Sequence, residues 1–185
     1  MEGFGGTEGV IKGKSELYEY LSSNHKTAFI NSDDAIQNEK TTNINRITFG
    51  FNNPENFVNI TKIETNPMVK IEFEDTTIQS HLIGLYNANN INAAITIGKH
   101  FGVSNEKIKF GLENYIPNNN RSQLLEKNSN KIILDAYNAN PSSMNAALTN
   151  FFQLEEKNKV AILGDMFELG IESSDEHKKL IEFCF

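Results

Sequence analysis

An acid, a tyrosine and two asparagines follow one another closely in LDAYNANPSSM, residues 134–144. An apolar run ends at Asp135, and Tyr137, Asn138 and Asn140 come before a proline. A carboxylate and two carboxamides are costly to remove from water unless a ligand or water satisfies them. The stretch therefore predicts a polar site that binds a ligand or stays hydrated.

Two aspartates end predicted strands in the second part of the chain. Asp135 ends the run KIILD, and Asp165 ends KVAILGD. Ligands of open parallel α/β sheets collect beyond the carboxyl ends of the strands, so both carboxylates are candidates for a binding crevice. We expect Asn140 to cap the helix that begins at the following proline, which leaves Asp135, Tyr137 and Asn138 facing the crevice. The alternative is that Asp135 only accepts hydrogen bonds from loop amides.

Lys14 is a second candidate, on a helix predicted from residue 10 to residue 21. At roughly 100° per residue, Lys14 falls on the same face as Val10, Leu17 and Leu21. Burial of its stem would direct the ammonium to a partner or favour the neutral amine. A neutral lysine can react with CO2, and the resulting carbamate is an oxygen ligand suited to Mg2+. The alternative is a lysine at the helix edge whose ammonium reaches water.

Asn87 and Asn90 stand three residues apart at the start of a helix predicted within NANNINAAITIGKHFG. Helical spacing places both on the apolar side, whereas Asn89 and Asn92 project outward. Two inward carboxamides could hydrogen-bond the edge of a purine. The alternative is that Asn87 is an N-cap and Asn90 is an ordinary polar residue of the first turn.

Arg121 lies in NYIPNNNRSQ, a stretch whose composition breaks regular structure and suits a linker. A guanidinium on a hinge could clamp a phosphate when two domains close, and the alternative is a solvated linker charge. His177 follows SSDE, which resembles a capping box of Ser173 and Glu176, so we expect it on a helix surface.

The elements that position these residues indicate an α/β fold. Before residue 117, periodicity predicts the 10–21 helix, a strand in TAFIN, a helix at 35–40, antiparallel strands within 44–83, and helices after residue 84 and at 104–112. Beyond it, KIILD, PSSMNAALTNFF, KVAILGD and SSDEHKKLIEF form a βαβα pattern, which predicts a parallel, doubly wound sheet. We place a boundary at Pro117, between domains of residues 1–117 and 118–185.

Composition narrows the class of partner. The 185 residues carry a formal charge of -7, and the clustered Lys and Arg of a nucleic-acid surface are absent. No window is apolar enough to span a bilayer. The single cysteine, Cys184, excludes a disulfide framework and a cysteine-built zinc site. We therefore expect a cytoplasmic, monomeric protein with a small-molecule ligand, and no nucleic-acid or membrane partner.

Six stretches together carry a family resemblance. They are, in chain order, EGFGGTEGVIKGKSELY, INSDD, GLYNANNINAA, NNNRSQ, LDAYNANPSSM and LGDMFELG. This set resembles the Mur ligases over nearly the whole chain, and the last three stretches are the most specific. The resemblance implies a three-domain ligase of bacterial cell-wall synthesis. Residues 1–117 would be part of its central ATPase domain, and residues 118–185 part of its Rossmann-like C-terminal domain.

The resemblance also implies catalytic and nucleotide-binding roles. Lys14 matches the carbamylated lysine that helps to hold Mg2+, and Asn87 and Asn90 match asparagines that line the adenine site. Arg121 and Asp135 match residues that reach the phosphates and ribose of ATP. ATP and Mg2+ are therefore the implied cofactors.

The substrates follow from the same resemblance. Tyr137, Asn138 and Asn140 would face the active-site cleft, together with Asp165 at the next strand end. In the branch of the family that adds a dipeptide, ATP phosphorylates the carboxylate of UDP-N-acetylmuramoyl-tripeptide, and the amine of D-alanyl-D-alanine attacks the acyl phosphate. Sister ligases that add meso-diaminopimelate or lysine, folylpolyglutamate synthetase, and a non-catalytic nucleotide-binding module are the alternatives.

The chain departs from the family pattern at its beginning. EGFGG lacks the Gly-Lys-Ser/Thr ending of a phosphate-binding loop and the strand that precedes one. The metal-binding Glu and His that the family carries before this stretch are also missing. We therefore expect a fragment that does not hydrolyse ATP by itself.

Overall fold

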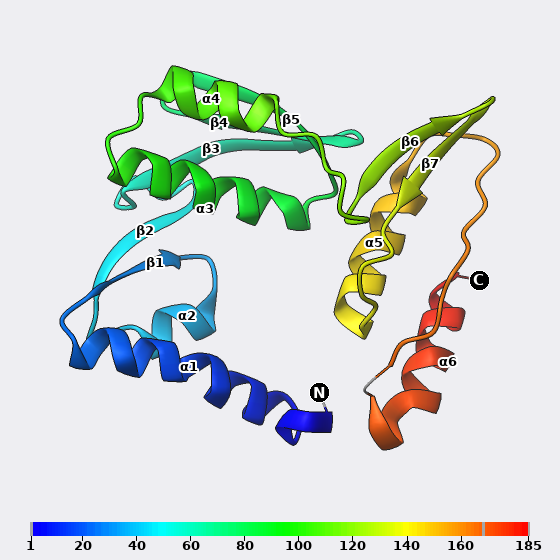
Figure 1. Cartoon of the computed structure of the whole chain (residues 1–185), viewed down its shortest axis with the longest axis horizontal. Coiled ribbons are helices and arrows are strands. Elements are labelled where there is room, and N and C mark those ends of the chain that lie inside the picture. The colour runs from blue at the N-terminus through cyan, green and yellow to red at the C-terminus, as the bar shows by residue number, and fades with distance from the viewer. Residues whose placement is uncertain (1, 168, 185) are drawn as a thin grey trace.

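The computed structural model describes residues 2–167 and 169–184 and contains two groups of elements (Figure 1). The first group comprises η1 (Glu2–Phe4), α1 (Thr7–Ser23), β1 (Thr27–Asn31), α2 (Ala35–Lys40), β2 (Asn45–Phe51), β3 (Val58–Thr65), β4 (Met68–Phe73), β5 (Thr76–Ile83), α3 (Tyr86–His100) and α4 (Asn105–Glu113). The second comprises β6 (Gln123–Lys127), β7 (Asn130–Leu134), α5 (Pro141–Gln153), η2 (Gly170–Glu172) and α6 (Ser173–Cys184). The fold class is α/β, as predicted.

The first group is built on a five-stranded sheet with the strands in sequence order. β1, β2 and β3 run parallel, and β3, β4 and β5 run antiparallel. The prediction of antiparallel strands throughout residues 44–83 is therefore wrong for β2, because α2 and the NNPEN stretch both act as crossovers. At the end of β2, the Phe51 amide donates to Asp33 Oδ2 (2.8 Å) in the loop after β1, so a side chain satisfies this strand end.

The main core lies between this sheet and α3. Ala88, Ile91 and Ile95 of α3 pack against buried residues of the strands, among them Ile60 and Ile71. These three helical positions recur at the spacing of one helix face, which is why the sequence predicts this helix correctly. The core fixes the start of α3 beside the end of β5, where Asn87 lies.

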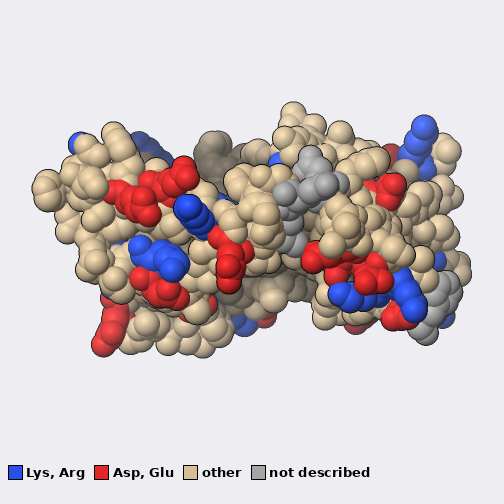
Figure 2. Space-filling view, turned by 90° about the horizontal axis from the view of Figure 1, so that it is seen from below, with Lys and Arg blue, Asp and Glu red and all other residues tan. Residues whose placement is uncertain are grey.

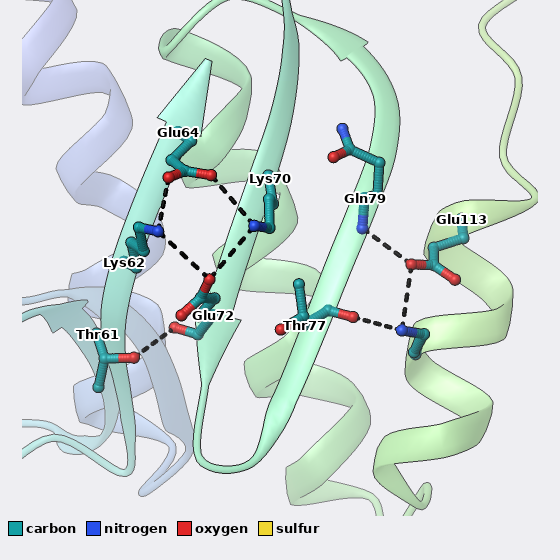
Figure 3. Close-up of polar contacts among 9 residues, drawn as sticks. Thr61, Lys62, Glu64, Lys70, Glu72, Thr77, Gln79 and Glu113 are labelled. Atoms are coloured by element: carbon teal, nitrogen blue, oxygen red, sulfur yellow. Dashed lines mark hydrogen bonds and ion pairs between the residues drawn. The ribbon is translucent and has the colours of Figure 1, made fainter. Parts of the chain in front are cut away.

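The outer face of the antiparallel strands carries a ring of four charges (Figure 3). Lys62 contacts Glu64 at 2.6 Å and Glu72 at 3.7 Å, and Lys70 contacts the same carboxylates at 3.2 Å and 3.5 Å. The hydrogen bond from Lys62, followed by that from Lys70, lowers the pKa of Glu64. Figure 3 shows all four side chains pointing toward one another across β3 and β4, so this ring belongs to the sheet surface and not to a ligand site.

The second group lies to one side of the five-stranded sheet (Figure 1). β6 and β7 form an antiparallel hairpin, and a small core of Leu148, Met166, Leu169 and Leu180 joins α5 to α6. The KIILD strand is found as β7. KVAILGD, residues 159–165, forms no strand among the described residues, so the predicted parallel pairing with β7 is wrong. Val160 and Ile162 of this stretch are 81% and 93% exposed, because no described element packs over their side chains.

The stretch between α4 and β6 has no helix or strand in the part of the chain that the structure describes, as its composition predicts. Asn120 and Ser122 both have positive φ angles, 57° and 50°, which turn the chain sharply into β6. This connection brings the open end of the hairpin to the start of α3. The domain boundary at Pro117 stays a prediction.

Candidate functional site

Five polar side chains form a continuous relay between the two groups of elements. Asn90 Nδ2 donates to Asn87 Oδ1 (3.2 Å), and Asn87 Nδ2 donates to Ser122 Oγ (3.3 Å). The Ser122 hydroxyl contacts the Tyr86 hydroxyl, which donates to Asp135 Oδ2 (3.1 Å). Since the phenol hydrogen points to Asp135, the Ser122 hydroxyl is the donor to Tyr86. Every donor therefore points the same way, and the relay ends on a carboxylate.

Three elements place this relay. Tyr86 begins α3, while Ser122 and Asp135 flank the open end of the β6–β7 hairpin. The last pair of the hairpin is Gln123 with Leu134, so Ser122 and Asp135 are the next two positions outward, one on each strand. A single hydroxyl from the first group thus contacts the residue before β6 and the residue after β7.

Burial changes the acidity of the phenol at the centre of the relay. Ser122 is 1% exposed, and the Tyr86 side chain lies over it. Desolvation is the largest cause that raises the pKa of Tyr86, to about 12. The hydrogen bond from Ser122 lowers this pKa, and the charge and hydrogen bonding of Asp135 raise it again. Tyr86 is therefore a neutral donor at physiological pH.

The asparagines of α3 differ from their predicted orientations. Asn87 is buried as predicted, but Asn90 is exposed, and Asn92, which we expected to project outward, is 3% exposed. Asn87 is not an N-cap: Leu85 holds that position, and Asn87 Nδ2 donates back to the Ile83 carbonyl (2.8 Å). The buried Asn87 carboxamide thus supports the site. The exposed Asn90 carboxamide leaves its carbonyl oxygen and second N–H open to a ligand.

Arg121 and the LDAYNANPSSM residues form the outer part of the site. The Arg121 guanidinium stacks on the Tyr137 ring, 3.8 Å from its centroid. Arg121, Tyr137 and Asn138 are all exposed. The Asn140 side chain accepts from the Ser143 amide (2.9 Å) in a capping box that starts α5, which confirms the predicted cap. Asn140 therefore has a structural role in this arrangement.

Asp165 lies outside the relay. It follows no strand, and its Oδ1 is 2.6 Å from His177 Nε2 on α6. The Met166 amide donates to the same nitrogen (3.1 Å), and a single ring nitrogen cannot accept from this amide and donate to Asp165 at once. His177 is half-buried and fastens the 159–167 stretch to α6. The predictions of Asp165 at a strand end and of His177 as a surface residue are therefore wrong.

Lys14 also differs from its prediction. It lies in α1, which has no buried residue, and Lys14 and Leu17 are both exposed. The stem is therefore not buried on an apolar face, because no described element covers this side of α1. Within the described residues, no three His, Cys, Asp or Glu side chains gather as a metal site. The carbamate and Mg2+ predictions for Lys14 stay predictions.

Sequence reasoning missed two members of the relay. Tyr86 and Ser122 lie inside GLYNANNINAA and NNNRSQ, but each has an ordinary residue type for its position. Only the adjacency of Asn87 to Tyr86 and of Arg121 to Ser122 in the sequence could have indicated a role. Their contacts depend on the turn through Asn120, which no local pattern predicts.

The fold and the relay define an α/β protein with a polar site between two groups of elements. The Mur ligase middle domain family matches residues 1–98, and the family described as Mur ligase, glutamate ligase domain, matches residues 120–184. The chain therefore belongs to the Mur ligase family.

Three relatives illustrate this membership. The UDP-N-acetylmuramoyl-tripeptide–D-alanyl-D-alanine ligase of Bacillus subtilis is 30% identical over 181 residues, 97% of this chain and 40% of the relative. A crystal structure of MurF from Acinetobacter baumannii has a TM-score of 0.80 at 29% identity, over 96% of this chain and 40% of that one. MurF from Thermotoga maritima, solved in complex with ADP, shares the fold with a TM-score of 0.80 at 23% identity, over 97% of this chain and 42% of that one.

The chain thus spans about 40% of the length of the relatives it matches. Among the described residues, no helix has the length and apolar character that crossing a membrane requires. On the face shown in Figure 2, acidic and basic side chains of described residues are interspersed.

Proposed function

We propose that this chain supplies the adenosine-binding part of an ATP-dependent amide ligase. The relay carries the proposal, because it places Asn90 and Asp135 at the two ends of one hydrogen-bonded series. A carboxamide that both donates and accepts suits the edge of adenine, and a carboxylate suits the hydroxyls of ribose. The two ends thus match the two parts of one nucleoside.

Both ends of the relay keep hydrogen-bonding atoms that a ligand could use. Asp135 uses Oδ2 for Tyr86, and Oδ1 stays open to accept a ribose hydroxyl. Arg121 stacks on Tyr137, two residues after Asp135, and brings a positive charge that suits a phosphate. ATP with its Mg2+ is therefore the proposed nucleotide, and Lys14 is the proposed, untested contributor to the metal site.

The proposed reaction is the one named for the Bacillus relative. A carboxylate oxygen of UDP-N-acetylmuramoyl-tripeptide attacks the γ-phosphorus of ATP, and ADP leaves. The amine of D-alanyl-D-alanine then attacks the carbonyl carbon, and phosphate leaves as the amide forms. In this chain Tyr137 and Asn138 are the proposed substrate-facing residues, and catalysis would come from positioning and charge neutralisation. We propose that the protein acts as a cytoplasmic monomer.

Binding of ADP by the purified chain, measured by isothermal titration calorimetry, tests the nucleotide site. Asn90→Ala and Asp135→Ala should each weaken binding about tenfold, since each removes a hydrogen bond to the ligand. Asn89→Ala, on the exposed side of the same helix, is the matched control and should bind as the parent does. An affinity equal to that of the parent in both variants would contradict the site, and so would a parent that does not bind.

The nucleotide-binding measurement also separates the alternative functions. D-alanyl-D-alanine, lysine or glutamate is added to the nucleotide-bound chain, and the nucleotide affinity is measured again. A change in nucleotide affinity with the dipeptide alone favours the dipeptide-adding branch. A change with lysine favours a sister ligase, and one with glutamate favours a folylpolyglutamate synthetase. Nucleotide binding that none of these compounds affects favours a non-catalytic nucleotide-binding module.

A further inference from the structure

We infer that Tyr86 is a positioning residue that latches the β6–β7 hairpin to the start of α3 and holds Asp135 in place. Its hydroxyl contacts Ser122 on the β6 side and Asp135 on the β7 side. No other described side chain of the first group hydrogen-bonds both Ser122 and Asp135. The phenol therefore controls how the second group of elements sits against the first.

The backbone around the hairpin strengthens this junction. The Ala136 amide donates to the Asn120 carbonyl (2.8 Å), so the chain after β7 is fastened to the chain before β6. Ser122 has a φ of 50°, which is uncommon for a serine, and it is 1% exposed. Hydrogen bonds from Asn87 and to Tyr86 hold it in this conformation. A conformation that needs such support is expected to relax when a supporting contact is lost.

The sequence also makes room for the phenol ring. Gly84 has a φ of 89°, and a Cβ at this position would lie 2.6 Å from Tyr86 Cε1. A side chain at residue 84 would therefore push the ring out of its place. Gly84 and Tyr86 form one local unit, in which the glycine allows the ring to lie over the end of β5 and reach the hairpin.

The consequence for ligand binding rests on the proposed function. Asp135 is exposed, and an exposed carboxylate samples several rotamers unless a partner fixes it. The Tyr86 hydrogen bond selects one of them and leaves Oδ1 toward solvent. Loss of the phenol hydroxyl should therefore weaken nucleotide binding even though Tyr86 itself does not contact the ligand.

Limited trypsin digestion of the chain tests the latch without any nucleotide. Arg121 precedes the buried Ser122, so cleavage after Arg121 requires the junction to open. The initial rate at Arg121 is measured by mass spectrometry relative to the rate at exposed Lys26. Tyr86→Phe should raise this ratio about fivefold, the effect of one lost hydrogen bond, and Tyr20→Phe on exposed α1 is the matched control. A ratio in Tyr86→Phe equal to that of the control would overturn the latch.

A double-mutant cycle covers the case in which Tyr86→Phe disturbs folding. Asp135→Ala changes an exposed residue and should also raise the Arg121 cleavage ratio. If Asp135 acts through Tyr86, the double variant should be cleaved no faster than Tyr86→Phe. Effects that multiply in the double variant would overturn the coupling.

Nucleotide affinity then separates this inference from the proposed function. Tyr86→Phe should weaken binding of ADP about fivefold, with binding by Tyr20→Phe unchanged. Unchanged affinity together with faster cleavage would overturn the positioning of Asp135. Absence of binding in the parent overturns the nucleotide proposal alone, because the cleavage ratios still decide the latch.

Discussion

Tyr86 has an unusual acid–base environment that spectroscopy can detect. Partial burial, together with the charge of Asp135, raises its pKa to about 12, so it should ionise later than a fully solvated tyrosine. Asp135→Asn removes the charge and should bring the last tyrosine transition to lower pH. Ultraviolet difference titration at the tyrosinate band checks this, with Asn138→Asp as a control that changes charge nearby. A last transition at the same pH in Asp135→Asn would contradict the described contact.

The same pKa shift predicts a loss of stability in strong alkali. The neutral phenol is favoured in the folded chain, where its pKa is about 12, over the unfolded chain, where it is 10. Its contribution is therefore complete below pH 10 and decreases as the pH rises from 10 to 12. Urea unfolding across this interval should show a steeper decrease of stability in the parent than in Tyr86→Phe. Equal slopes would mean that Tyr86 has an ordinary pKa in the folded state.

At the residue scale, the sequence predicted the positions of Asp135 and Asn87 better than the orientations of Asn90 and Asn92. Asp135 and Asn87 follow from a strand end and a helix start, and the structure does bring them into one relay. The orientations of Asn90 and Asn92 were wrong because a helical wheel shows which face a residue lies on, and not how neighbouring elements cover that face. The predicted burial of the Lys14 stem was wrong for the same reason, since no described element covers that face of α1.

At the scale of elements, Asn140 should stabilise α5 more than any other exposed side chain of its loop. It satisfies the Ser143 amide, while the Ser143 hydroxyl accepts from the Asn140 amide (3.1 Å). Asn140→Ala should lower the free energy of unfolding by about 1 kcal/mol, and Asn140→Asp should retain most of the stability. Urea denaturation followed by circular dichroism measures both.

Asn138→Ala is the matched control for this cap. Asn138 is exposed, and its side chain only accepts from the adjacent Ala139 amide (3.0 Å). Its loss should therefore cost much less than the loss of Asn140. Equal costs at the two positions would show that the capping box does not stabilise α5.

Elements were predictable where a local pattern decides them. The helices at α2, α3 and α5 follow from apolar spacing and from the Pro141 start signal. Strand pairing was less predictable, because it depends on distant partners. β6 was missed since QLLEK has no alternation, and KVAILGD was predicted as a strand although no described strand lies beside it.

At the scale of the whole molecule, two separate cores are joined by a thin polar junction. The larger core contains eleven buried residues and the smaller contains four among those described. Between them lie the irregular connection after α4 and the Tyr86 relay. A junction of this kind favours relative motion of the two parts.

The two cores should therefore unfold separately, and the smaller should unfold first. A core of four residues buries little apolar area, so it supplies less stability than the sheet-based core. Hydrogen exchange in increasing urea, followed in α3 and α5 by mass spectrometry, resolves the two events.

Leu148→Ala should destabilise α5 by about 2–5 kcal/mol and leave α3 protected, and Ile95→Ala should destabilise α3 by a similar amount. Ile97→Ala, at a position 41% exposed on the same helix as Ile95, should have a much smaller effect. Equal loss of protection in both helices for either core variant would show one cooperative unit instead of two.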